Sequence, residues 1–466
     1  TASAAFPTDT WTQIYRVIAN ANLIINSSIT GAAADDLKAQ ALVARALAHF
    51  DLLKLYGQHH VTGQGGLEAL GVPYVKTYRD LNQLAPARNK VSEVKQFIYA
   101  DLDAALPLFG STLDYTKINK QSAYAIKSRV GIYFGDWSIA KDAAATALGL
   151  GTATIVPQSG FVSSFAADGK QVNSVFELVQ LSNDNNGING LYQIYGATNY
   201  GDVVINDTQN FQAIYETADV RKSAFMIGTI AGFQRNIGKY TKLATNTKVI
   251  RYEEIVLNYA EALLETGDAA GALTQINRIT AQRGATAYTV ANKANVLLER
   301  RRELAFEGFR FDDRVRNGLG TPTSPKATTA FAYGDYRMAF PIPQSEINGN
   351  AAMKQNYNYY MLNNYKNFKN FKNFKKLNKF KLIILYNNHL DILYNIQLDY
   401  NLLIIFIKEY KKLFRNYYCE KQFIMYIKYQ IEKIKSSLLY RTKQNSIKYI
   451  LNNENNFKTI MHYKII

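Results

Sequence analysis

The fold is decided by residues 252–272, which read YEEIVLNYAEALLETGDAAGA. Before Gly267, apolar residues recur every three or four positions, which is the spacing of one face of an α-helix. Glycine readily adopts the left-handed conformation that ends a helix, and aspartate, here Asp268, is a preferred first cap of the next one. Small residues such as Ala260 and Ala272 allow two helices to approach closely. The stretch therefore predicts a helix, a tight turn and a second helix.

A second copy of this pattern lies around Gly135, where residues 132–137 read IYFGDW. Ala140 stands five residues after this glycine, as Ala272 does after Gly267. Repeated helix-turn-helix units are typical of tetratricopeptide proteins, in which successive helix pairs stack into a superhelix. We therefore predict a mainly α, tetratricopeptide-like helical superhelix.

Helical patterns extend outward from both copies. One apolar stripe starts at Trp11, after the expected capping residues Asp9 and Thr10, and a second helix ends at Tyr56, before Gly57 as an expected left-handed C-cap. A single helix is expected over 291–316. Between the helical parts lies a polar stretch rich in Asn and Gly with short β-leaning runs. The predicted organisation is helical at 9–151, an irregular and partly β insertion at 152–247, helical at 250–318, a loop and short helix at 319–360, and a tail at 361–466.

The tail, residues 361–466, differs in composition from the rest of the chain. All 28 Gly and all nine Pro precede it, and it holds 20 Lys+Arg against 6 Asp+Glu, or +14 of the net charge of +17. Its common residues have A/T-rich codons, as expected of an open frame through A/T-rich non-coding DNA. A basic arm for nucleic acid or an anionic membrane is the alternative. We predict a non-native or disordered tail and assign it no function.

Without the tail, charge is nearly balanced, with 34 Lys+Arg and 31 Asp+Glu in residues 1–360. This balance argues against a nucleic-acid partner. His59 and His60 are adjacent and so cannot share a helix face as a zincin metal pair does. No nucleophile elbow and no phosphate-binding loop is present. We therefore expect no metal and no cofactor.

Three segments carry a more specific signal: RYEEIVLNYAEA at 251–262, ERRRELAFEGFRFDD at 299–313 and FPIPQSEI at 340–347. In this order and spacing they resemble the C-terminal half of the SusD/RagB family of outer-membrane nutrient-binding lipoproteins. Gly135-Asp136-Trp137 and Asp219-Val220-Arg221 match the same family upstream. The resemblance covers residues 1 to about 360.

The resemblance implies a surface-exposed, helical protein that binds oligosaccharides and delivers them to a SusC-like TonB-dependent transporter, without enzyme activity. It also implies attachment to the outer membrane through an N-terminal lipid on a cysteine. That cysteine and the residues before the first helix are absent from this sequence, so it is similar to an N-terminally truncated member. A RagB-like oligopeptide-binding protein and a tetratricopeptide adaptor for a protein partner remain alternatives.

Arg300, Glu303 and Glu307 lie at helical spacing in the second segment. Two carboxylates can flank the scissile bond in glycoside hydrolases. Here, however, the neighbouring arginines would keep both carboxylates ionised and leave no proton donor. We therefore expect an ion-pair network that fixes the last helices to the scaffold.

Aromatic residues on loops are the candidate ligand-binding residues. Sugars present apolar C–H faces that stack on rings and polar rims that hydrogen-bond to nearby side chains. The insertion and a second loop each offer such a mixture, and the predicted site residues are Tyr192, Tyr195, Asn199, Tyr200 and Asp202, with Tyr74, Tyr78 and Arg79. The alternative is that these side chains pack the loops onto the scaffold.

Overall fold

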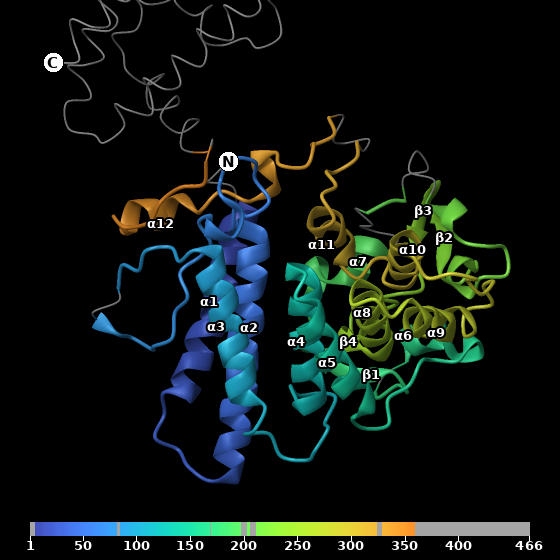
Figure 1. Ribbon diagram of the computed structural model, residues 1–466, viewed down its shortest axis with the longest axis horizontal. Coiled ribbons are helices and arrows are strands. Elements are labelled where there is room, and N and C mark those ends of the chain that lie inside the picture. Colours follow the sequence, from blue (N-terminus) through green and yellow to red (C-terminus); the bar gives the residue numbers. More distant parts are fainter. Residues whose placement is uncertain are drawn as a thin grey trace, which may run out of the picture. The chain divides into compact units, whose positions relative to one another are not determined.

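The computed structural model describes residues 5–81, 84–167, 169–196, 203–205, 211–323, 329–357 and 359. The chain divides into two compact units, Thr1–Phe371 and Lys372–Ile466, and all described residues belong to the first. This described part contains twelve α-helices and two two-stranded sheets (Figure 1), which confirms the mainly α prediction. The tail at 361–466 lies outside the described residues. None of the described helices has the length and apolar character needed to cross a membrane.

Three long helices lie side by side at the N-terminal end (Figure 1): α1 (Ala5–Ile25), α2 (Ala32–Tyr56) and α3 (Val91–Ala105). Trp11 and Ile18 of α1 are buried, as the apolar stripe predicts. The helix begins at Ala5, so Asp9 and Thr10 lie inside it, and the prediction that they cap it is wrong.

Gly57 corrects a second expectation. Its backbone is extended, with φ −73° and ψ 149°, and so it is not a left-handed cap. A glycine is nevertheless required here, because a Cβ would lie 2.6 Å from the carbonyl oxygen of Leu53. The reason for the glycine is therefore lack of space and not a positive φ.

The two helix-turn-helix units are α4 (Lys120–Phe134) with α5 (Trp137–Gly149), and α8 (Tyr252–Glu265) with α9 (Ala269–Thr280). Gly135 and Gly267 have φ values of 74° and 93°, the left-handed conformation predicted for them. Asp268 accepts a hydrogen bond from a backbone N–H in the first turn of α9, whereas Asp136 pairs instead with Lys95 of α3. Helix α5 packs against α8, so the two units stack on each other.

The close approach of α4 and α5 at Gly131 leaves no room for a side chain. A Cβ on Gly131 would lie 2.8 Å from the Cβ of Ala140. We expect Gly131→Ala to lower the free energy of unfolding, measured in urea, by about 1–3 kcal/mol, because overpacking forces the helices apart. Gly149→Ala is the control, since nothing lies within 4 Å of its new Cβ. Equal effects of the two substitutions would show that the helices have room to adjust.

The insertion is irregular and partly β, as predicted. Strand β1 (Ser174–Leu178) pairs antiparallel with β4 (Thr247–Arg251), which continues directly into α8. Strands β2 (Ile227–Ile230) and β3 (Phe233–Asn236) form a hairpin, whose turn residues Ala231 and Gly232 both have positive φ; two-residue hairpin turns favour this conformation. Short helices α6 (Ser163–Ala166) and α7 (Leu191–Tyr195) complete the insertion, with 3₁₀ turns at Gln158–Gly160, Gly187–Asn189, Gln212–Ile214 and Val220–Lys222.

The helix predicted over 291–316 is broken into α10 (Lys293–Glu303) and α11 (Phe309–Arg316), so that prediction is wrong. Phe306 and Gly308 have φ values of 68° and 86°, which a right-handed helix cannot contain. The apolar pattern runs on across the break, and for this reason the sequence did not indicate it. The last short helix is α12 (Gln344–Gly349), and further 3₁₀ turns lie at Gly66–Glu68 and Tyr336–Met338.

After α11 the chain returns to the N-terminal helices. Buried Arg88 donates hydrogen bonds to the carbonyl oxygens of Tyr56 and Gly71 and to the side-chain oxygen of Asn356, the last at 2.6 Å. The Asn356 amide in turn donates to the carbonyl oxygens of Tyr56 and Phe340. This Arg88–Asn356 contact holds the C-terminal segment against the end of α2.

Candidate functional site

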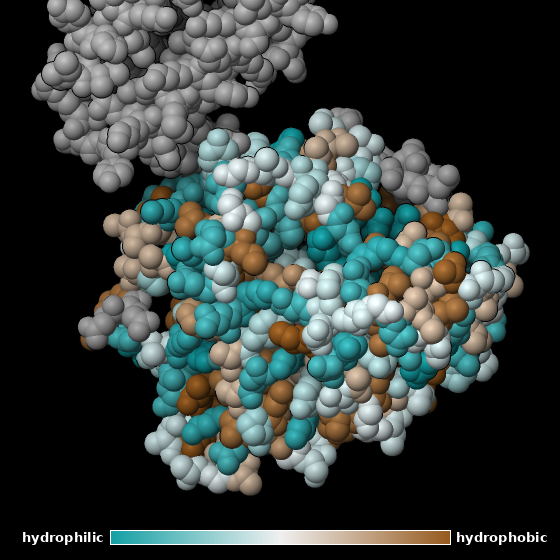
Figure 2. Space-filling view, viewed as in Figure 1, coloured by the Kyte–Doolittle hydropathy of each residue, from teal (hydrophilic) through white to brown (hydrophobic). Residues whose placement is uncertain are grey.

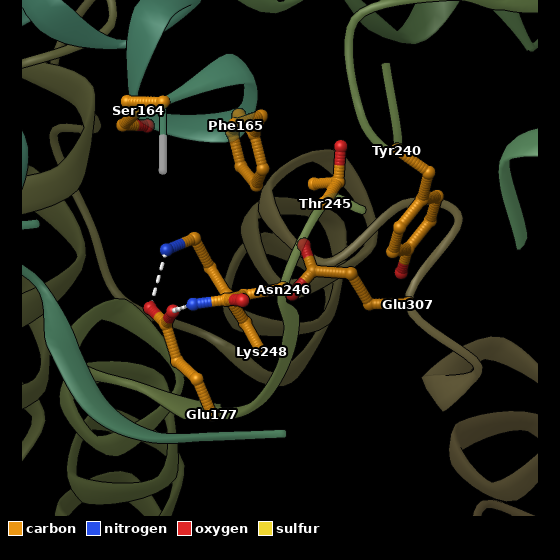
Figure 3. Close-up of a pocket in the computed structure, with 9 residues that line it drawn as sticks. Ser164, Phe165, Glu177, Tyr240, Thr245, Asn246, Lys248 and Glu307 are labelled. Atoms are coloured by element: carbon orange, nitrogen blue, oxygen red, sulfur yellow. Dashed lines mark hydrogen bonds and ion pairs between the residues drawn. The ribbon is translucent and has the colours of Figure 1, made fainter. Parts of the chain in front are cut away.

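A small hollow lies where the β1–β4 sheet meets the turn between α10 and α11 (Figure 3). Two aromatic rings, two carboxylates, an amide and an ammonium group contribute to its wall, from Phe165, Tyr240, Glu177, Glu307, Asn246 and Lys248. Binding sites of small polar ligands combine ring surface with a few oriented polar groups in this way.

The polar side of the hollow is held by the register of the sheet. Glu177 of β1 stands opposite Lys248 of β4. The Lys248 ammonium donates to one oxygen of the Glu177 carboxylate at 2.6 Å, and the Asn246 amide donates to the other at 3.2 Å (Figure 3). The Asn246 carbonyl oxygen accepts from the backbone N–H of Gln180 at 3.1 Å. These side chains are therefore fixed in place without a ligand.

Tyr240, which lines the hollow, and its neighbour Phe306, which does not, have an unusual backbone conformation. Tyr240 and Phe306 are two of the four non-glycine residues with positive φ in the part of the chain that the structure describes. Such a conformation costs of order 1–3 kcal/mol and persists only where the surroundings impose it. The Tyr240 hydroxyl donates to the Phe306 carbonyl oxygen at 3.2 Å. The backbone thus fixes the direction of both rings.

Tyr195, at the end of α7, does not line the hollow but contacts Tyr240, which does. Its ring stacks on Tyr240 with centroids 5.7 Å apart and meets Phe306 edge-on at 5.8 Å. We refer to Tyr195, Tyr240 and Phe306 as the three-ring group; all three residues are half-buried. Burial raises the pKa of both tyrosine hydroxyls, so they stay protonated at neutral pH.

The carboxylates below the hollow form the predicted ion-pair network. Glu307 accepts from Lys239 and Arg251, and Glu303 accepts from Arg221, Arg251 and Arg283. Burial alone would raise the pKa of these two carboxyls, but the cations outweigh it and lower the pKa of both. Both carboxylates therefore stay ionised and neither can act as a general acid, which confirms the expected network.

On the face of the molecule shown in Figure 2, hydrophobic residues are scattered among hydrophilic ones and do not gather into one large patch. Large exposed apolar patches mark extended protein or membrane contacts. This face shows no such patch.

The predicted site residues of the insertion are partly placed. Tyr195 belongs to the three-ring group, and Tyr192 is half-buried on α7, one turn before it. Asn199, Tyr200 and Asp202 lie outside the described residues. The structure therefore brings one predicted tyrosine to the edge of the hollow and leaves the role of the other four residues a prediction.

The residues of the second predicted loop pack mainly against α1 and α2. Tyr74 is 8% exposed, stacks on His49 at 3.7 Å and donates its hydroxyl to Asp101 at 2.6 Å, so its ring is part of the core. Tyr78 is half-buried and Arg79 is exposed, with the guanidinium 5.2 Å from the tyrosine ring. No ring contact or hydrogen bond given for the described residues joins this loop to the three-ring group.

Several residues of the hollow were not predicted from the sequence. Tyr240 has the same signal as Tyr195, an aromatic residue in an Asn- and Gly-rich insertion, and could have been found by it. Glu177 and Lys248 have no such signal, because they meet only through the pairing of two strands far apart in the chain.

Comparisons with known proteins agree with this picture. Residues 127–359, half of the chain, match the SusD family, and residues 1–132 match a family described as starch-binding and associating with the outer membrane. Among curated protein sequences, none matches.

Solved structures of the same family share the fold. A putative sugar-binding protein from Bacteroides vulgatus is 27% identical, with a TM-score of 0.67 over 75% of this chain and 85% of that one. A SusD superfamily protein from Bacteroides thetaiotaomicron is also 27% identical, with a TM-score of 0.65 over 74% and 84%. A laminarin-binding SusD-like protein, 19% identical with a TM-score of 0.60 over 75% and 85%, has the same fold. This chain therefore belongs to the SusD family of carbohydrate-binding proteins associated with the outer membrane.

Proposed function

We propose that this protein binds oligosaccharides at the cell surface, in and around the hollow, and delivers them to a SusC-like TonB-dependent transporter. The observation that carries the proposal is the three-ring group beside the fixed Asn246–Glu177–Lys248 side of the hollow. A sugar ring would lie with its C–H face on Tyr240 or Tyr195. Its hydroxyls would then reach the amide and carboxylate oxygens.

The proposal includes no chemical step. The ionised Glu303 and Glu307 offer no proton to a glycosidic oxygen, and a glycosidase needs such a proton donor. A protein that delivers its ligand must also release it. We therefore expect dissociation constants between about 1 mM and 1 µM, which correspond to roughly −4 to −8 kcal/mol.

Most of the other predicted site residues are proposed to make secondary contacts with the ligand around the hollow. Tyr192 stands one turn from Tyr195 and is proposed to extend the aromatic surface, together with Asn199, Tyr200 and Asp202. Tyr78 and Arg79 are proposed as a separate contact for a longer ligand. Tyr74 is left out, because its ring is covered by His49 and its hydroxyl is bound to Asp101.

We expect Tyr240→Ala and Tyr195→Ala each to weaken oligosaccharide binding by about tenfold or more, because each removes a stacking ring of the three-ring group. Calorimetry with starch-derived and laminarin-derived oligosaccharides, and with oligopeptides, measures the effect. Tyr357→Ala is the control, since Tyr357 is 52% exposed and lies outside the hollow.

Three outcomes would count against the proposal. Release of reducing ends from the bound sugar would show hydrolysis. Preference for oligopeptides would favour a RagB-like protein. Unchanged affinity in both site variants would place the ligand elsewhere. Delivery is tested separately by co-purification with a SusC-like transporter, and failure of that test alone would leave the binding proposal standing.

A further inference from the structure

His59 and His60 lie in the turn after α2, where both rings face one phenol. The Nε2 atom of His59 lies 2.9 Å from the hydroxyl oxygen of Tyr133, and the Nε2 atom of His60 lies 3.1 Å from the same oxygen. The two imidazole centroids are 4.0 Å apart. The expectation that adjacent histidines cannot act together assumed a helix; in a turn, both side chains converge.

Hydrogen bonding alone does not satisfy this cluster. The Tyr133 hydroxyl has one proton, so it donates to one imidazole and must accept from the other. The Nδ1 atom of His59 is buried and has no partner. Whichever tautomer His59 adopts, this atom carries either an unpaired N–H or an unpaired lone pair. Buried unpaired polar atoms are costly, so hydrogen bonding does not fully satisfy this cluster.

The atoms that face each other are of the kind a transition metal ion binds. Both Nε2 atoms lie within hydrogen-bond distance of the same phenol oxygen. Metal ions bind the neutral form of imidazole.

We propose that His59, His60 and Tyr133 bind one divalent first-row transition metal ion of the Zn²⁺ and Cu²⁺ class. A tetrahedral ion with Zn–N bonds of about 2.0–2.1 Å separates its ligand atoms by about 3.3 Å. The two observed nitrogen-to-oxygen distances are a few tenths shorter, so a small opening of the cluster admits the ion. Imidazole ligands favour this class over Mg²⁺ and Ca²⁺.

The fourth position of the ion would remain open to water or a ligand. Tyr333, whose ring centroid is 6.2 Å from that of His60, is 45% exposed and marks the solvent side. When the phenol joins as a ligand, its O–H bond breaks, an oxygen–metal bond forms and the proton passes to solvent. Because the phenol must lose this proton to bind, metal affinity is expected to rise with pH.

The test uses the full chain without an affinity tag. Calorimetric titration with Zn²⁺ is expected to show a site that His59→Gln and His60→Gln each weaken at least tenfold. Tyr133→Phe keeps the ring and removes the oxygen, and it is expected to weaken Zn²⁺ binding and to abolish the visible charge-transfer absorption that a Cu²⁺–phenolate bond gives. The double variant His389→Gln, His462→Gln removes two other histidines of the chain and is expected to bind as the unmodified protein does.

Equal Zn²⁺ isotherms in the unmodified protein and the His59 and His60 variants would overturn the proposal. So would loss of binding in the His389 and His462 variant alone. If a histidine variant fails to fold, the proposal is still tested by comparing the Cu²⁺ charge-transfer absorption of the unmodified protein with that of Tyr133→Phe. No charge-transfer band at saturating Cu²⁺ would overturn the three-ligand site.

Discussion

Glu303→Gln is expected to lower the free energy of unfolding by about 3–5 kcal/mol, the range for breaking a buried ion pair on one side. The Glu303 carboxylate is fully buried and accepts from Arg251 at 2.6 Å, from Arg283 at 2.9 Å and from Arg221 at 3.1 Å. A neutral amide cannot balance three guanidinium groups and would turn two N–H donors toward them. The loss therefore combines uncompensated charge with lost hydrogen bonds.

Urea unfolding monitored by circular dichroism measures this loss. Glu265→Gln is the matched control, since Glu265 is another helical glutamate that pairs with a lysine, Lys293, but is 28% exposed. Exposed ion pairs contribute at most about 1 kcal/mol. A similarly small effect at Glu303 would mean that the network does not hold α10 to the scaffold.

Acidification from pH 6.5 to 4.5 is expected to cost the unmodified protein about 2 kcal/mol more than His49→Gln. His49 is buried, its Nδ1 contacts the carbonyl oxygen of Arg45 and its Nε2 accepts from the backbone N–H of Val75. Burial lowers the pKa of His49 from 6.5 to about 3. As the pH falls below 6.5, the His49 imidazole binds a proton in the unfolded chain but not in the folded chain. The free energy of unfolding therefore decreases until about pH 3.

The range from pH 6.5 to 4.5 separates the effect of His49 from the effect of carboxylate titration. Glu261 has a pKa of about 2, lowered chiefly by Arg316 against the opposing effect of burial, so the stability it adds is present above pH 4.5 and lost only below it. The measurement is the free energy of unfolding in urea at several pH values for both proteins. Because His49→Gln has a lower overall stability, only the slopes of the free energy of unfolding against pH are compared. Parallel slopes would contradict a neutral buried His49.

The helical scaffold was predictable because its signals are local. Gly267 and Asp268 define a turn within two residues, and the spacing of Glu303 and Glu307 on one segment indicated a network of charges. The break at Phe306 was not predictable, since its positive φ is imposed by contacts with Tyr195 and Tyr240 from the insertion. Local patterns thus determine helices, while long-range contacts determine where one is interrupted.

The candidate site was less predictable for the same reason. Its polar side depends on Glu177 meeting Lys248, 71 residues away, in a register that no local pattern encodes. Tyr74 satisfied the pattern of an aromatic on a polar loop but is used in the core, because a nearby Asp101 gives its hydroxyl a buried partner. An aromatic residue in a loop therefore indicates either packing or binding until its neighbours are known.

The Arg88–Asn356 contact has a consequence for biosynthesis. It joins residues 268 positions apart, so the ribosome has released the first helices long before their last acceptor is made. Burial lowers the pKa of Arg88 to about 9, because folding removes this cation from water. The N-terminal part of the chain therefore cannot complete this contact until the C-terminal segment has been made. Contacts between residues so far apart in sequence slow folding.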